Sequence, residues 1–144
     1  MQGIRIIEIP DCKMVSSGIG MFGEEKFGGF FEWFSSLPTT IFPENFLFPD
    51  GGALHWINIY HEGMATPEGY DIIDFKGGLY AIATDIDQQT DMTALDACRD
   101  EFLKTNGFVV DESRPRMGNV ITSPKTEKIM GYNQMDYYTP IKPA

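Results

Sequence analysis

The sequence predicts an α+β domain in which a βαββ unit occurs twice. Two segments, 23–37 and 90–106, have the periodicity of helices, and a strand-like segment precedes each of them. Two further strand-like segments follow each helix. This agreement between the halves indicates a duplicated unit, with an antiparallel sheet and helices packed on one of its faces. The chain has 144 residues, a length that suits one compact domain spanning 1–144.

The first predicted unit begins with a strand over residues 4–17, where apolar and β-branched residues predominate. Pro10 interrupts this strand, and because proline lacks a backbone N–H we expect a bend or a sheet edge there. A helix over 23–37 follows, since apolar residues recur at steps of three and four. The residues of this stripe are Phe27, Phe30, Phe34 and Leu37. Trp33 lies at the flank of the stripe.

Residues 38–52 contain three prolines and are expected to form a loop. Three phenylalanines, among them Phe48, make this segment too apolar for a fully solvated loop. It either covers a core or closes over a cleft as a lid. A strand over 54–61 and its hairpin partner over 70–75 complete the first unit.

The second predicted unit contains strands 79–86, 114–122 and 134–142. Its helix, 90–106, is the clearest prediction. Thr90 or Asp91 can cap the first turn of this helix, and Gly107 can end it. Two such units side by side form a concave groove at their junction, and junctions of this kind are favoured ligand sites. The groove between the halves is therefore the expected functional site.

The composition is acidic, with 21 Asp and Glu residues against 11 Lys and Arg residues and a net charge of −10. A phosphate backbone repels such a surface, and no cluster of basic residues offsets it, so direct nucleic-acid binding is not expected. Two interpretations of the charge stay open. Either it attracts cationic ligands, or it only keeps the protein in solution.

The N-terminal segment contains charges at Arg5 and Glu8 and lacks the apolar core of a signal peptide. No apolar run approaches the length of a membrane span. Cys12 and Cys98 form no metal or redox motif, and we expect reduced, partly buried thiols. These features predict a cytoplasmic protein that does not enter a membrane.

Both histidines of the chain, His55 and His61, lie in the segment ALHWINIYHE. Along a strand they are about 20 Å apart at roughly 3.3 Å per residue, too far to hold one metal ion together. We therefore expect neither a metal nor a cofactor. The sequence also lacks a phosphate-binding glycine loop and a Gly-x-Ser-x-Gly elbow, so it predicts no catalytic residue.

Side chains alternate along a strand, so Trp56, Asn58 and Tyr60 share one face of the histidine-bearing strand. Aromatic rings and an amide suit a binding surface, and we expect this face to line the groove. Ile57 and Ile59, on the other face, are then expected to pack under the helices. An ordinary half-buried strand would show the same alternation, and spacing alone leaves both interpretations open.

The last predicted strand places Asp136 and Tyr138 on one face. If this face lines the groove, Asp136 can balance the charge of a bound cation. The alternative is a solvated carboxylate at a sheet edge. Met117 can add an adaptable apolar surface, although methionine more commonly fills a core.

Several segments fall in an order that resembles the GyrI-like small-molecule-binding domain, also called the bacterial effector-binding domain. These segments are INIYHE, GYDIIDF, FKGGLYAIATDID, NGFVVDESRPRM and MDYYTPIK. The resemblance covers nearly the whole chain and implies the duplicated βαββ, SHS2-like fold. Members of this family bind lipophilic cations in a groove lined by aromatics and an acid, often within multidrug-responsive transcription regulators. With no helix-turn-helix segment before the domain, the chain resembles the stand-alone members.

The resemblance carries over to three positions, Tyr60, Tyr80 and Asp136, which match aromatic or acidic positions of the family. One departure concerns the cation partner. Where many members have a Phe-Glu pair after the second helix, this chain has Met117-Gly118. The resemblance then implies that cation binding depends on Asp136, on Glu44 or on rings alone, or that a neutral ligand takes its place.

The expected function is a stand-alone binding module for hydrophobic, including cationic, drug-like molecules. Two alternatives are a protein-binding inhibitor of the DNA gyrase type and a hydrolase of strained electrophilic natural products. The residues expected to contact the ligand are Trp33, Glu44, Phe48, Trp56, Asn58, Tyr60, Met117, Asp136 and Tyr138.

Overall fold

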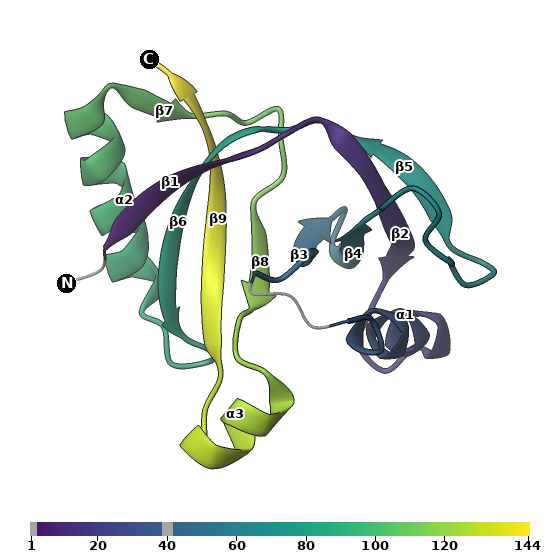
Figure 1. Ribbon diagram of the computed structural model, residues 1–144. Helices are drawn as coiled ribbons and strands as arrows, with labels where there is room; N and C mark the ends of the chain where they lie inside the picture. Colours follow the sequence, from purple (N-terminus) through teal and green to yellow (C-terminus); the bar gives the residue numbers. More distant parts are fainter. Residues whose placement is uncertain (1–2, 39–41) are drawn as a thin grey trace. The chain divides into compact units, whose positions relative to one another are not determined.

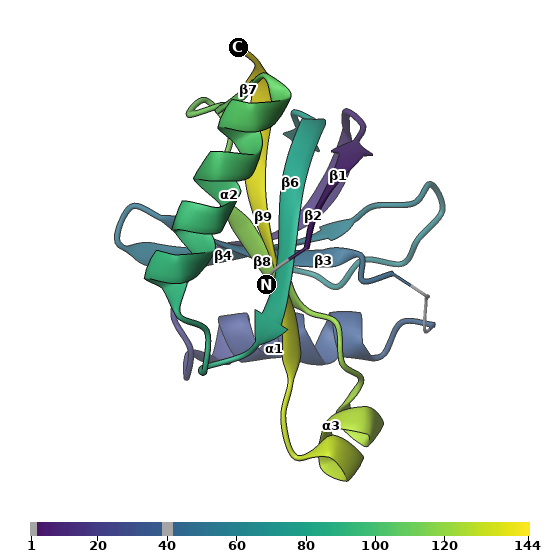
Figure 2. The ribbon, with the colours of Figure 1, turned by 90° about the vertical axis from the view of Figure 1, so that its left-hand side faces the viewer.

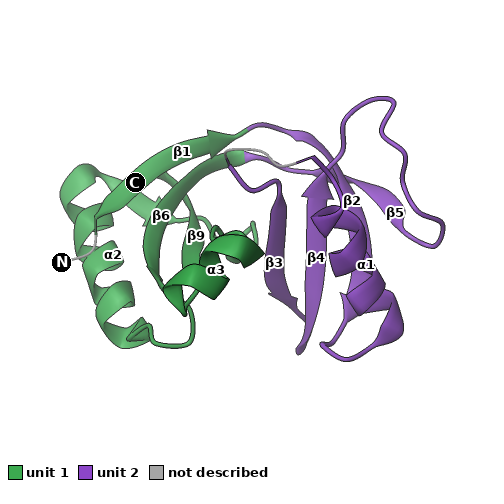
Figure 3. Ribbon diagram, turned by 60° about the horizontal axis from the view of Figure 1, so that its bottom comes forward, with its two compact units in different colours: residues 1–9, 78–144 green, residues 10–77 purple. Residues whose placement is uncertain are grey.

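The computed structural model describes residues 3–38 and 42–144 and has mixed α+β composition. The strands within these ranges are β1 (Ile4–Ile9), β2 (Cys12–Gly20), β3 (Asn45–Asp50), β4 (Ala53–Ile59), β5 (Asp71–Phe75), β6 (Gly78–Ile86), β7 (Phe108–Val110), β8 (Met117–Val120) and β9 (Gln134–Pro143). The helices are α1 (Glu25–Ser35), α2 (Met92–Asn106) and α3 (Pro124–Met130). The chain divides into two compact units: unit 1 comprises residues 1–9 and 78–144, and unit 2 comprises residues 10–77 (Figure 3).

Unit 1 contains an antiparallel sheet with the strand order β1-β6-β9-β8, and β7 also pairs with β9. Helix α2 runs along one face of this sheet (Figures 1 and 2). A small aliphatic core of Ala81, Leu103 and Ile141 fills the space beneath it. The opposite face of the sheet is therefore free of α2.

Helix α2 begins and ends where its capping residues predict. The Asp91 side chain accepts a hydrogen bond from the Ala94 N–H, which satisfies one of the free donors of the first turn. Gly107 has a positive φ of 78°, and its N–H donates to the carbonyl of Leu103. A left-handed residue at this position favours glycine, because other residues meet a steric penalty there. The predicted helix is confirmed.

Unit 2 contains an antiparallel sheet with the strand order β3-β4-β2-β5. Helix α1 packs on β2 and β4 of this sheet. Strands β3 and β4 form a hairpin whose turn is Gly51-Gly52, with φ angles of 60° and 84°. Two consecutive positive φ angles are typical of the tight turns that match the twist of a hairpin, and they favour glycine.

The two units repeat one chain order. Unit 2 runs β2-α1-β3-β4, and unit 1 runs β6-α2-β8-β9 with β7 and α3 inserted. In each sheet the third strand of the repeat lies between the first and the second, and one further strand flanks the first. The predicted α+β fold with a duplicated βαββ unit is confirmed.

Three of the predicted elements differ from the structure. The segment 38–52 contains a strand, β3, although its prolines predict a loop; residues 39–41 of it lie outside the described residues. Strand β5 pairs with β2 and not with the strand before it, because β4 already has β2 and β3 as neighbours. The predicted strand over 4–17 is two strands, and β1 belongs to unit 1 while β2 belongs to unit 2.

Candidate functional site

Helix α1 covers the face of the unit 2 sheet that carries Trp56. The indole stacks on the ring of Phe27, with centroids 4.7 Å apart and planes at 22°. Three more rings lie 5.4–5.6 Å from it, those of Phe22, Phe31 and Phe34. The expectation that the isoleucines of β4 pack under the helix is therefore wrong. The aromatic stripe of α1 gains more contact area against an indole than against an isoleucine.

The opposite face of the same sheet carries His55 and Ile57. Phe48 lies directly across from His55 in β3, with ring centroids 4.7 Å apart. Ile57 is fully buried on this face. Phe48 and Trp56, both expected in one site, thus lie on opposite faces of the sheet, since neighbouring residues on a strand point in opposite directions.

Three other residues of unit 2 that we expected to bind the ligand instead contact backbone groups or rings of the protein itself. Asn58 is buried, and its side-chain amide donates to the carbonyl of Ile59. Tyr60 follows the end of β4, where its backbone N–H donates to the carbonyl of Lys13. Trp33 lies on α1 with its ring 5.4 Å from that of Phe30. The structure does not bring these residues into one cluster with Phe48.

The two histidines have separate carboxylate partners. His61 Nε2 lies 2.8 Å from Glu44 Oε2 on the surface. His55 Nδ1 lies 3.1 Å from Asp50 Oδ2, and its Nε2 lies 2.5 Å from Ser16 Oγ. Glu44, one of the expected cation partners, is therefore already paired. Within the described residues, no group of three His, Cys, Asp or Glu side chains is placed to hold a metal ion.

Unit 1 brings three predicted residues together. Asp136 and Tyr138 alternate on β9 and share the face that α2 leaves free, and Met117 lies directly across from Tyr138 in β8. All three are buried. The ring of Tyr80 joins them, edge-on to Tyr138 at 6.2 Å between centroids. We call Tyr80, Met117, Asp136 and Tyr138 the unit 1 face.

Asp136 on this face already has a cationic partner. Arg5 Nη2 lies 2.5 Å from one carboxylate oxygen, and Thr84 Oγ1 donates to the other at 2.5 Å. The Asp136 side chain is 3% exposed and that of Arg5 is 54% exposed. The alternative of a solvated edge carboxylate is therefore wrong. Sequence reasoning did not find Arg5, because the contact depends on the pairing of β1 with β6 and spans 131 residues.

A buried arginine supports the same face from the other end of β6. The Arg114 guanidinium lies 4.8 Å over the ring of Tyr80 and donates to the carbonyls of Leu79 and Ile141. A Cβ at Gly78, where φ is +148°, would lie 2.7 Å from this guanidinium, so the residue must be glycine. Burial raises the pKa of the Tyr80 hydroxyl, and the nearby cation opposes this rise.

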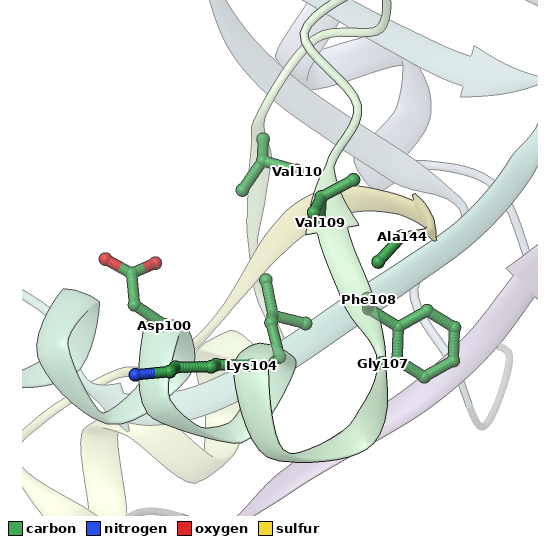
Figure 4. A pocket seen from close by; sticks show the side chains of 8 residues that line it. Asp100, Lys104, Gly107, Phe108, Val109, Val110 and Ala144 are labelled. Atoms are coloured by element: carbon green, nitrogen blue, oxygen red, sulfur yellow. The ribbon is translucent and has the colours of Figure 1, made fainter.

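A separate hollow of about 340 Å³ lies at the C-terminal end of α2 in unit 1 (Figure 4). Its lining consists of Asp100, Leu103, Lys104, Gly107, Phe108, Val109, Val110 and Ala144. The side chains in the close-up are mostly apolar, with Asp100 and Lys104 as the charged members. None of the residues expected to bind the ligand lines this hollow.

Across residues 3–38 and 42–144, none of the helices combines the length and the apolar character that crossing a membrane requires.

No family model matches the sequence. No curated protein matches it either.

Solved structures match almost the whole chain. The C-terminal domain of EcmrR has a TM-score of 0.65 at 8% identity, over 100% of this chain and 99% of that one. A hydrolase from Listeria innocua has a TM-score of 0.67 at 12% identity, over 96% and 91%. The protein SAV2435, bound to tetraphenylphosphonium, has a TM-score of 0.56 at 11% identity, over 97% and 94%.

These likenesses define the class of fold. The chain has the GyrI-like α+β fold, which it shares with the C-terminal domain of EcmrR and with a bacterial transcription-regulation protein from Staphylococcus aureus. At sequence identities this low, the likeness applies to the backbone arrangement. The role of each side chain has to come from the residues of this chain.

Proposed function

We propose that this chain is a small-molecule-binding module of the GyrI-like type that takes hydrophobic ligands, lipophilic cations among them. The observation that carries the proposal is the fold shared with a protein whose structure contains tetraphenylphosphonium. A second similar structure is the C-terminal domain of EcmrR, of which 99% is covered, and a longer EcmrR chain in a complex with DNA is covered to 58%. Nothing in the described residues favours the gyrase-inhibitor alternative.

We place the ligand contacts on the unit 1 face. Tyr138 supplies an aromatic ring, Met117 supplies a polarisable thioether, and Asp136 supplies a carboxylate. This combination of apolar side chains and a single acid suits a hydrophobic molecule with or without positive charge, and because all three side chains are buried a ligand must displace what covers them. Phe48 lies in unit 2, with its ring against that of His55, and is not part of this face. Trp56 instead packs with α1.

Charge recognition on this face is limited by Arg5. Its guanidinium already balances Asp136, so a cationic ligand gains little from the carboxylate unless Arg5 moves away. Stacking of a cation on an aromatic ring contributes about 0.5–2 kcal/mol. Micromolar affinity corresponds to about 8 kcal/mol. Apolar contact must therefore supply most of the binding free energy, and neutral ligands of the same shape should bind as well.

Calorimetric titration with tetraphenylphosphonium and with the neutral triphenylphosphine oxide tests this proposal. We expect saturable binding of both, with dissociation constants within about tenfold of each other, because a stacked cation contributes about 0.5–2 kcal/mol and a tenfold change corresponds to about 1.4 kcal/mol. The variant Tyr138→Ala should weaken both. Tyr137→Ala is the matched control, since Tyr137 points to the opposite face and its hydroxyl contacts Thr90. Absence of saturable binding by either compound, and of any shift in melting temperature, would contradict the proposal.

A further inference from the structure

Three side chains of unit 2 form a continuous hydrogen-bonded chain that the proposed function does not use. Ser16 Oγ lies 2.5 Å from Nε2 of His55. The other ring nitrogen of His55, Nδ1, lies 3.1 Å from Oδ2 of Asp50. A hydroxyl, an imidazole and a carboxylate in this order are the groups of a serine nucleophile with its general base and the residue that orients the base.

Local backbone features of three strands bring these groups together. Strands β2 and β4 pair in register up to Ser16, and the register then shifts before Ile19. Gly18 within this bulge has a φ of +72°, a conformation that favours glycine. Asp50 is the last residue of β3, directly before the Gly51-Gly52 turn. Because Ser16 lies across from Ile57 and Phe48 lies across from His55, regular alternation places Ser16, His55 and Asp50 on one face of the sheet.

The hydrogen bonds determine which atom holds each proton. An ionised Asp50 carboxylate only accepts, so His55 Nδ1 holds its hydrogen and donates it. In a neutral imidazole that donates from Nδ1, Nε2 is the acceptor. The Gly18 N–H donates to Ser16 Oγ at 3.0 Å, which leaves the Ser16 hydroxyl hydrogen to be donated to Nε2. The hydroxyl proton thus already lies on the hydrogen bond to the base.

The surroundings of this chain of groups are apolar and restrict access. The Phe48 ring lies against the imidazole, with centroids 4.7 Å apart. Phe46 and Ile57 share the same face and are buried. Ser16 is 4% exposed, and the His55 side chain is 13% exposed. These exposures suit a small, apolar acyl group better than a bulky or charged one.

We propose that Ser16 is a nucleophile for acyl transfer from esters with small acyl groups, with His55 as general base and Asp50 as a positioning residue. Ser16 Oγ forms a bond to the acyl carbon while its proton passes to His55 Nε2. The bond from the acyl carbon to the alcohol oxygen then breaks, and the alcohol leaves with that proton. Water deacylates Ser16 through the same base, which releases the acid and restores the hydroxyl.

The test is reaction of the full chain with p-nitrophenyl acetate, followed by intact mass and peptide mapping. We expect one acetyl group on Ser16 and release of p-nitrophenol, both absent in Ser16→Ala. Ser17→Ala is the matched control, because within the described residues the Ser17 hydroxyl bonds backbone atoms, the carbonyl of Gly18 and the N–H of Trp56. His55→Gln should slow acetylation by about 100-fold or more, the usual contribution of a general base.

Variants of Asp50 test whether its carboxylate orients His55 or only fills space. Asp50→Asn should slow acetylation by at least tenfold, and Asp50→Glu should recover part of the rate. The Asp50 side chain is 40% exposed, so these two variants keep the comparison valid even if Ser16→Ala fails to fold. Acetylation at another residue, an unchanged rate in Ser16→Ala or an unchanged rate in Asp50→Asn would overturn the proposal. These readouts do not depend on binding of tetraphenylphosphonium.

Discussion

The two units share one chain order but bury different chemistry under their helices. Unit 2 packs the aromatic rings of α1 against Trp56, with centroid distances of 4.7–5.5 Å from Phe27, Phe31 and Phe34. Unit 1 packs α2 on small aliphatic residues, Ala81 and Ile141 among others. The same topology therefore tolerates two kinds of core, because strand order is set by hydrogen bonding and each core only has to fill its own volume.

The two helices also differ in how their ends are stabilised. Helix α2 has a side-chain cap at Asp91 and a left-handed glycine at its end. Helix α1 begins after Glu24, whose side chain makes no capping hydrogen bond within the described residues, and it contains Gly28 and Gly29. Since its local signals are weak, α1 depends on packing of its apolar face to be stable, whereas α2 has support from its own ends.

The largest expected effect concerns the indole of Trp56. Trp56→Ala should lower the free energy of unfolding by up to about 3–5 kcal/mol, because it removes a half-buried ring that contacts four others. Urea denaturation measures this loss. Trp33→Ala is the control, because among the described rings that of Trp33 contacts only Phe30, and its cost should be clearly smaller. Equal costs would show that unit 2 does not depend on the cluster around Trp56.

The next effect concerns the ion pair between Arg5 and the buried Asp136 in unit 1. Arg5→Ala should lower the free energy of unfolding by about 1–3 kcal/mol, because it leaves the buried Asp136 carboxylate without its cation. The double variant Arg5→Ala with Asp136→Asn should recover much of this loss, since an amide carries no charge to desolvate. Thermal and urea unfolding of the set checks this, and additive losses would contradict it.

The smallest effect concerns the neighbouring glycines of α1. Of the described heavy atoms, none outside the helix backbone lies within 4 Å of a Cβ built on Gly28, so Gly28→Ala should stabilise the protein by up to about 1 kcal/mol. A Cβ on Gly29 would lie 3.0 Å from the hydroxyl of Tyr70, which donates to the carbonyl of Lys26. Gly29→Ala should therefore gain less or lose stability. Equal gains in melting temperature would show that Gly29 is not needed for packing.

Local signals predicted most elements, and contacts distant in sequence account for the rest. The Asp91 cap, Gly107 and the Pro10 interruption each act on their own neighbours, so their effects could be foreseen. Strand β3 was not predicted, because its segment is rich in proline. Strand β5 pairs with β2, which is not the strand next to it in the sequence. The candidate site was foreseen in part. Asp136, Tyr138 and Met117 share a face, whereas the ion pair between Asp136 and Arg5 was not expected.

The sequence by itself determined the α+β class, the strands and helix of the βαββ repeat in unit 1, the ends of α2 and the alternation that places Asp136 beside Tyr138 on one face, because periodicity and capping are short-range properties. Tertiary structure alone decided which face of β4 lies under α1, which cation neutralises Asp136, and that Ser16, His55 and Asp50 meet. Each of these three features depends on strand pairing or helix packing between segments that are distant in sequence. Alternation gives every strand two faces, and only packing decides which face is covered.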